Sequence, residues 1–112
     1  MNRRREISKA YKERRLVGGV YRITNIRTGK YLLGHAVDIA SLRNRFEFAL
    51  STGSAVDPRL RADWETYGPI AFGLEVLDEL EKTSEQSQVD FVTDLQALEQ
   101  LRRADLGGGD HY

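Results

Sequence analysis

The chain has 112 residues, of which 40% are hydrophobic and 30% charged, and its formal net charge is zero. This length and composition fit one globular domain with its own core. The absence of cysteine excludes disulfides, thiolate metal sites and a cysteine nucleophile. No apolar run approaches the roughly 20 residues that cross a membrane, and the N-terminus has no secretory signal, so we expect a cytoplasmic protein.

Charge is distributed unevenly along the chain. Residues 1–16 carry seven Arg or Lys and two Glu, a net charge of +5, whereas residues 75–99 carry eight acidic residues and one lysine, a net charge of −7. A basic end of this kind suggests an anionic partner. A solvated helix surface, or pairing of the basic end with the protein's own acidic half, is an equally open interpretation.

The chain begins with a predicted helix over residues 2–15, in which a narrow apolar stripe faces a basic surface. A glycine pair at 18–19 ends it. Strands are predicted over residues 20–25 and 30–34, because both are rich in β-branched, aromatic and aliphatic residues. Gly29 in the intervening turn suits a positive φ, so the pair predicts a β-hairpin.

The middle of the chain gives a mixed pattern. Residues 37–42 predict a short helix, and the alternation of apolar and other residues over 46–50 (FEFAL) favours a strand. Asp57 and Pro58 then predict the N-cap and first residue of a helix. Residues 72–77 (FGLEVL) predict a further strand with alternating apolar residues.

The strongest predicted helix spans residues 89–104, where Phe91, Leu95, Leu98 and Leu101 form an apolar arc. Glu99 projects on the core side of this helix, and an unpaired carboxylate there is costly. The tail over residues 107–112 (GGGDHY) is expected to be flexible.

The order of these elements predicts an α+β domain with a small, mostly antiparallel three-stranded sheet flanked by helices. We assign residues 1–16 to a basic N-terminal helix, residues 17–106 to the domain and residues 107–112 to the flexible tail.

Three blocks of sequence resemble the GIY-YIG nuclease family. The segments 19–21 (GVY) and 29–34 (GKYLLG) are similar to its two hairpin motifs, with the expected spacing. Residues 64–77 (WETYGPIAFGLEVL) resemble its helix, Tyr-Gly turn and third strand, and residues 97–100 (ALEQ) resemble the helix that carries its metal-binding glutamate.

The resemblance implies a divalent-metal endonuclease. Mg²⁺ or Mn²⁺ on Glu99 would act on a DNA phosphodiester, Tyr21 would orient the attacking water, and Arg43 would stabilise the charge on the phosphate. His35, just after the hairpin glycine, is a candidate general base at neutral pH. This hypothesis requires Tyr21 and Glu99 to lie on the same side of the sheet.

The sequence also departs from the family pattern. Leu32 stands where the second tyrosine belongs, Leu42 where the arginine belongs, and Phe46 where a histidine or tyrosine follows. Tyr31 is one residue early, and a one-residue shift in a strand moves a side chain to the other face. Tyr21 therefore occupies a site position, whereas Tyr31 is expected to pack on the opposite face.

Three functions remain open at this point: an active nuclease, an inactive nucleic-acid-binding module on the same scaffold, and a protein-interaction module without nucleic acid. DNA is the expected partner, with RNA as an alternative, no membrane role, and an oligomeric state that the sequence does not indicate. The predicted nucleic-acid-binding residues are Arg3, Arg4, Arg5, Lys9, Lys12, Arg14, Arg15 and Arg45.

Overall fold

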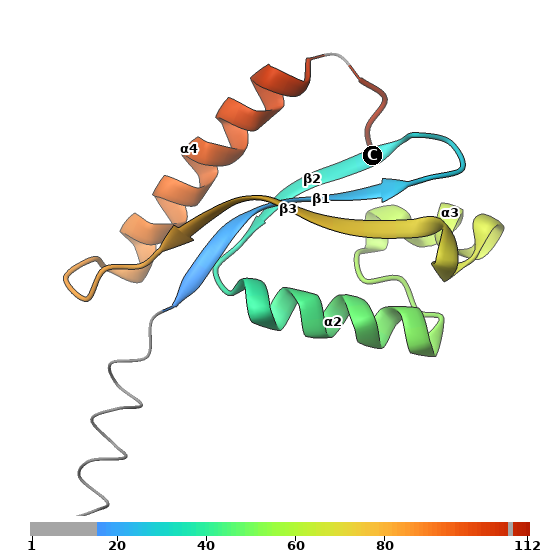
Figure 1. Ribbon diagram of the computed structural model, residues 1–112, viewed down its shortest axis with the longest axis horizontal. Coiled ribbons are helices and arrows are strands. Elements are labelled where there is room, and N and C mark those ends of the chain that lie inside the picture. The colour runs from blue at the N-terminus through green and yellow to red at the C-terminus, as the bar shows by residue number, and fades with distance from the viewer. Residues whose placement is uncertain (1–15, 108) are drawn as a thin grey trace, which may run out of the picture.

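The computed structural model describes residues 16–107 and 109–112, so the predicted helix over residues 2–15 lies outside the described part. Three strands, β1 (Val17–Asn25), β2 (Tyr31–Ala36) and β3 (Phe72–Glu81), form one antiparallel sheet in the order β2-β1-β3. The helix α4 (Gln88–Leu106) covers one face, and α2 (Ile39–Thr52) and α3 (Arg61–Tyr67) lie on the other (Figure 1). The predicted α+β class is confirmed. Within the described ranges, no helix combines the length and the apolar character that crossing a membrane requires.

The β1–β2 hairpin is organised by Asn25, which is fully buried. Its backbone oxygen accepts a hydrogen bond from the Gly29 N–H at 2.7 Å, and its side-chain Oδ1 accepts one from the Arg27 N–H at 3.0 Å. Gly29 has φ 80°, a conformation that L side chains disfavour. The predicted hairpin and turn are confirmed, although both strands are longer than predicted.

The predicted strand over residues 46–50 is wrong, because this segment is the second half of α2. Phe48 is 68% exposed, whereas the buried residues recur at helical spacing. These buried residues are Ile39, Leu42, Phe46 and Ala49. Asp38 caps the helix by accepting a hydrogen bond from the Ser41 N–H, and Gly53, with φ 77°, ends it. The alternating pattern thus comes from residues on two faces of one helix.

The main core fills the space between the sheet and the helices α2 and α3. Trp64 stacks on Phe72, with ring centroids 4.7 Å apart. Other members of this core are Ile23, Leu32, Phe46, Ala49, Leu60 and Ala71. Asp57 and Pro58 begin a short 3₁₀ helix (Pro58–Leu60) that leads into α3, and Asp57 accepts a hydrogen bond from the Arg59 N–H at 2.9 Å. The predicted helix start is confirmed, and a second 3₁₀ helix (Pro69–Ala71) leads from α3 into β3.

The opposite face is covered by α4. Phe91 and Leu95 are fully buried and approach Gly18, where an added Cβ would lie 2.9 Å and 3.1 Å from them. Arg102 attaches α4 to β3 through two hydrogen bonds to the Asp78 carboxylate, at 2.6 and 3.0 Å. The predicted apolar arc is shorter than expected, because Leu101 is 64% exposed.

Residues 109–112, which the sequence predicts to be flexible, lie along the outer edge of β2. Two backbone hydrogen bonds, of 3.2 and 2.8 Å, join Tyr31 to this segment in a short parallel pairing. The Tyr112 hydroxyl donates a hydrogen bond to Asp63 at 2.6 Å and accepts one from the Asn25 amide at 3.3 Å. These four residues are therefore a docked segment of the fold.

Candidate functional site

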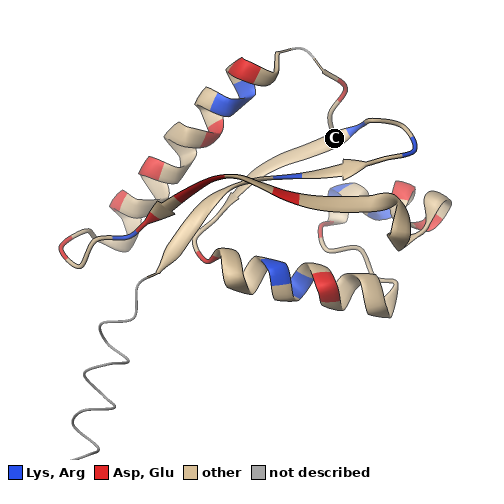
Figure 2. Cartoon of the chain, in the orientation of Figure 1, with Lys and Arg blue, Asp and Glu red and all other residues tan. Residues whose placement is uncertain are grey.

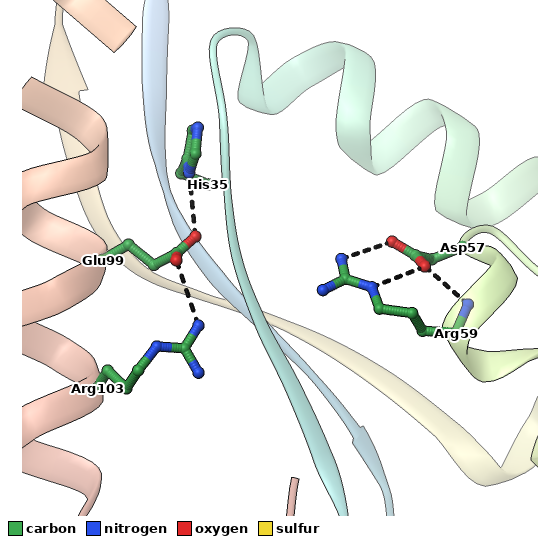
Figure 3. Close-up of polar contacts among 5 residues, drawn as sticks. All are labelled: His35, Asp57, Arg59, Glu99 and Arg103. Carbon is green, nitrogen blue, oxygen red and sulfur yellow. Dashed lines mark hydrogen bonds and ion pairs between the residues drawn. The ribbon is translucent and has the colours of Figure 1, made fainter. Parts of the chain in front are cut away.

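Charged side chains from both faces of the sheet lie beside β2, which forms one edge of the sheet. Figure 3 shows two groups of side chains there, one on each side of the β2 ribbon. Glu99 lies with His35 and Arg103 on the side of α4, and Asp57 lies with Arg59 on the other side. The edge is thus the place where charged groups from the two faces approach each other.

Tyr21 extends from the middle strand toward this edge. It pairs with Gly34 of β2, and an added Cβ at Gly34 would lie 2.7 Å from the Tyr21 Oη and 2.8 Å from its Cζ. The ring therefore lies directly over Gly34. Because Gly34 has no positive φ, glycine is needed there for space and not for backbone conformation. This contact gives a physical reason for the last glycine of the hairpin motif.

The phenol of Tyr21 is surrounded by charges. Burial raises its pKa above the ordinary value, and the Asp57 carboxylate raises it further. The Arg59 and Arg45 guanidinium groups lower the pKa, and Glu99 contributes a smaller rise. The net direction is upward, so the Tyr21 hydroxyl is protonated at neutral pH and can donate a hydrogen bond.

Glu99 is held from two sides. Its Oε1 lies 3.0 Å from His35 Nδ1, and its Oε2 accepts a hydrogen bond from Arg103 at 3.2 Å. Arg103 is one helical turn further along α4, the spacing at which opposite charges attract on a helix surface. The Glu99 side chain is only 17% exposed, so these contacts compensate the burial of its charge.

Tyr21 and Glu99 do not share a face of the sheet. Gly19 faces α2, since an added Cβ there would lie 3.1 Å from Ile39, and Gly18 faces α4. Tyr21 lies on the α2 side with Gly19, since it packs against the core cluster that contains Phe46 and Ala49 of α2. The nuclease hypothesis requires both groups on one side. The structure brings them together only at the β2 edge, close enough for the charge of Glu99 to act on Tyr21.

A divalent metal fits this arrangement poorly. Mg²⁺ in proteins is usually held by one or two carboxylates, with waters and substrate phosphates completing the shell. At Glu99 a cation would compete with Arg103 for Oε2 and would lie beside its positive charge. In the part of the chain that the structure describes, no three His, Asp or Glu side chains form a group that could hold a metal. The donor set therefore matches an internal ion pair better than a metal site.

The two predicted arginines of α2 differ in their placement. Arg43 and Arg45 are both exposed. The charge of Arg45 acts on Tyr21 and lowers the pKa of that phenol. The other predicted nucleic-acid-binding residues, from Arg3 to Arg15, lie outside the described residues.

The apolar residues at the positions where the resemblance predicts polar groups are part of the hydrophobic interior. Leu32, Leu42 and Phe46 are 1%, 3% and 6% exposed, and Leu32 and Phe46 belong to the main core. A polar side chain at any of these three positions would be buried among apolar side chains, and this burial would be costly. Tyr31 lies on the face opposite Tyr21, as predicted, with the guanidinium of Arg22 5.9 Å from its ring centroid.

Arg59 is a site cation that the sequence analysis misses. Its Nε and Nη2 donate hydrogen bonds to the two oxygens of Asp57, at 3.1 and 2.9 Å, and this pair holds the pKa of Asp57 below its ordinary value. The sequence predicts Asp57 as a helix cap, and the structure confirms that role. Only the tertiary fold, which brings this cap beside Tyr21, shows that the pair belongs to the site. The Glu99–Arg103 pair, in contrast, has a sequence signal in its spacing of four residues.

No protein-family model matches the sequence, and no curated protein matches it. Among solved structures, the chain is similar to the catalytic domain of the homing endonuclease I-TevI, with a TM-score of 0.48 and 18% identity, over 84% of this chain and 96% of that chain. An alanine mutant of the same catalytic domain gives a TM-score of 0.47 and 20% identity, over 72% of this chain and 86% of that chain. Because both TM-scores are below 0.5, the function is argued from the side chains of this chain alone.

Proposed function

We propose that this chain is a nuclease-like domain that binds the phosphodiester backbone of DNA at the β2 edge without hydrolysing it. The observation that carries this proposal is that the charges of Arg45 and of the Asp57–Arg59 pair act on the protonated hydroxyl of Tyr21. Guanidinium groups and hydroxyl donors are the groups with which proteins contact phosphate oxygens. Arg59 is 57% exposed, so its remaining N–H groups are available to a ligand.

The same edge is poorly equipped for hydrolysis. Leu32, Leu42 and Phe46 are buried where the family carries polar catalytic groups, and both oxygens of Glu99 are engaged within the chain. The raised pKa of Tyr21 also opposes its ionisation, so the phenol is a poor base at neutral pH. A hydrogen-bond donor beside Arg45 and beside Arg59, whose charge Asp57 partly compensates, can bind a phosphate without activating water.

Charge distribution supports binding in which the N-terminal segment takes part. Residues 1–15 carry the net charge of +5, and acidic side chains are concentrated along β3 and α4 (Figure 2). DNA would therefore approach the side of α2 and α3 and avoid the acidic part of the sheet. Binding that depends on phosphate contacts weakens steeply with salt.

The test is titration of the full chain with fluorescent single- and double-stranded DNA at low and raised salt. Arg59→Ala should weaken binding several-fold at low salt, because it removes a phosphate contact and leaves the Asp57 carboxylate unpaired. Arg61→Ala is the matched control, since Arg61 is an exposed arginine two residues away. Equal loss in both variants would place the phosphate elsewhere. Absence of binding at low salt would favour the protein-interaction function instead.

Hydrolysis at the same edge is the second candidate. It is favoured by one observation, that the charge of Glu99 acts on both Tyr21 and Arg59. It would require Arg103 to release Glu99. DNA cleavage in Mg²⁺ or Mn²⁺ that Glu99→Gln abolishes would establish it.

A further inference from the structure

A groove lies beside the β2-edge site, between α2 and the loop that follows it. Its volume is about 410 Å³, and it is lined by Arg45, Phe48 and Ala49 of α2 and by residues 54–56 of the loop. This size falls in the range of small-molecule pockets, about 300–1,000 Å³. We call it the α2 groove.

We propose that the α2 groove receives an unpaired nucleobase of the DNA strand whose phosphate is bound at the β2 edge. This inference rests on the proposed function and makes it more specific. It assigns single-stranded DNA, or a segment with an exposed base, as the preferred ligand.

Phe48 supplies the surface on which a base would stack. Its side chain is 68% exposed, although the neighbouring Phe46 on the same helix is buried in the core. An exposed aromatic ring beside a groove is a stacking surface for a base, and such stacking tolerates any base because each has a π-face. Ala49 and Val56 add apolar surface at the same place.

Polar groups along the groove match the edges of a base. Asn44 has an amide that both donates and accepts hydrogen bonds, and Ser41 and Ser54 have hydroxyl groups with the same dual capacity. These are the side-chain types that contact the hydrogen-bonding edges of splayed-out bases. An apolar peptide would use Phe48 but would leave these groups without a clear role.

Arg45 connects the groove to the phosphate site. It lines the groove, and its charge also lowers the pKa of Tyr21 at the β2 edge. One side chain thus belongs to both places, so a strand whose phosphate lies at the edge can bring one of its bases to the groove. A positively charged path combined with an aromatic platform is the usual design of single-strand binding surfaces. A paired base inside a duplex cannot enter such a groove.

The experiment compares three fluorescent probes of equal length at low salt: single-stranded oligothymidine, an abasic strand with the same backbone, and a duplex. Phe48→Ala should weaken binding of oligothymidine about ten-fold, the size expected for one lost stacking contact, and should leave the abasic strand unchanged. Ile70→Ala is the control, since Ile70 is 90% exposed and does not line the groove. Because Phe48 is exposed, its removal should leave the thermal unfolding midpoint unchanged.

The outcomes separate this inference from the proposed function. If Phe48→Ala leaves oligothymidine binding unchanged while Arg59→Ala weakens it, the groove proposal is overturned and the phosphate site stands. Equal weakening of all three probes by Phe48→Ala also overturns it. If no probe binds the wild-type chain, both proposals fail. If the wild-type chain sediments as a dimer that Phe48→Ala dissociates, the groove is an interface between copies and the base is excluded.

Discussion

Replacing Gly34 with alanine tests the placement of Tyr21 over the edge strand. The new methyl carbon would lie 2.7 Å from the Tyr21 Oη and 2.8 Å from Cζ. Carbon atoms in packed interiors are about 3.5–4.0 Å apart, so the phenol ring would have to move by about 1 Å. Forcing an extra methyl group into a packed site typically costs about 1–3 kcal/mol. We expect Gly34→Ala to lower the free energy of unfolding by that amount.

A double-mutant cycle isolates the contact. In a Tyr21→Ala background the obstacle is gone, and Gly34 has no positive φ that would disfavour alanine. Glycine-to-alanine substitution at such a position usually stabilises by about 0.4–1 kcal/mol, because it restricts the unfolded chain. The effect of Gly34→Ala should therefore change sign between the two backgrounds. Urea denaturation of the four proteins measures it. An equal loss of stability in both backgrounds would show that Tyr21 does not lie over Gly34.

Three further predictions concern the contacts that hold the fold together. Tyr112→Phe removes the hydroxyl that joins Asp63 and Asn25, so it should cost about 1–2 kcal/mol in urea denaturation, and an unchanged midpoint would mean that the C-terminal segment is not docked. Burial and Asp63 raise the pKa of Tyr112 from 10.0 to about 12, so the unfolded state ionises first. The free energy of unfolding should then fall as the pH rises from about 10 to about 12, and it should fall less in Tyr112→Phe. Unfolding followed by circular dichroism across this pH range measures the difference. The hydrogen bonds from Arg102 hold the pKa of Asp78 in the folded state below its ordinary value of 3.8. The Asp78–Arg102 pair therefore stabilises the fold above pH 3.8, and this stabilisation is lost as the pH falls through the lower folded-state pKa. Asp78→Asn should therefore be less stable at neutral pH, and a pH profile parallel to that of the wild type would contradict this linkage.

The sequence predicts those parts of the fold in which local chemistry and tertiary packing agree. The hairpin is predictable because Gly29 has the turn conformation that its residue type favours. The helix start before α3 is predictable because Asp57 is the N-cap and Pro58 the first residue of the 3₁₀ helix that leads into α3. In α2 the local pattern misleads, since Phe48 is exposed and contributes an aromatic residue to an apparent strand. The groove beside Phe48 offers a functional reason for that exposure.

The C-terminal segment could not be predicted from its own residues. Three glycines followed by polar residues suggest mobility, and local propensity favours no regular structure there. Its docking depends on Tyr112 reaching Asn25 and Asp63, which lie 87 and 49 residues away in the sequence. Contacts of this kind come from the tertiary fold and leave no local signal.

The candidate site is predicted in part. Tyr21 and Glu99 are predicted from their resemblance to family positions, and in the structure the charge of Glu99 acts on the Tyr21 phenol. Their positions on opposite faces and the pairing of Glu99 with Arg103 depend on strand register and on helix rotation. Arg59 is not predictable from the sequence, because its position beside Tyr21 follows from how the segment before α3 packs against the sheet.

The central claim is that the β2 edge binds DNA phosphate and does not cleave it. The most direct measurement incubates the full chain and Glu99→Gln with single- and double-stranded DNA in Mg²⁺ or Mn²⁺ at low salt, and follows binding and cleavage in the same samples. We predict salt-sensitive binding by both proteins and no cleavage by either. Cleavage by the wild-type chain that Glu99→Gln abolishes would contradict this account and identify the edge as a working nuclease site.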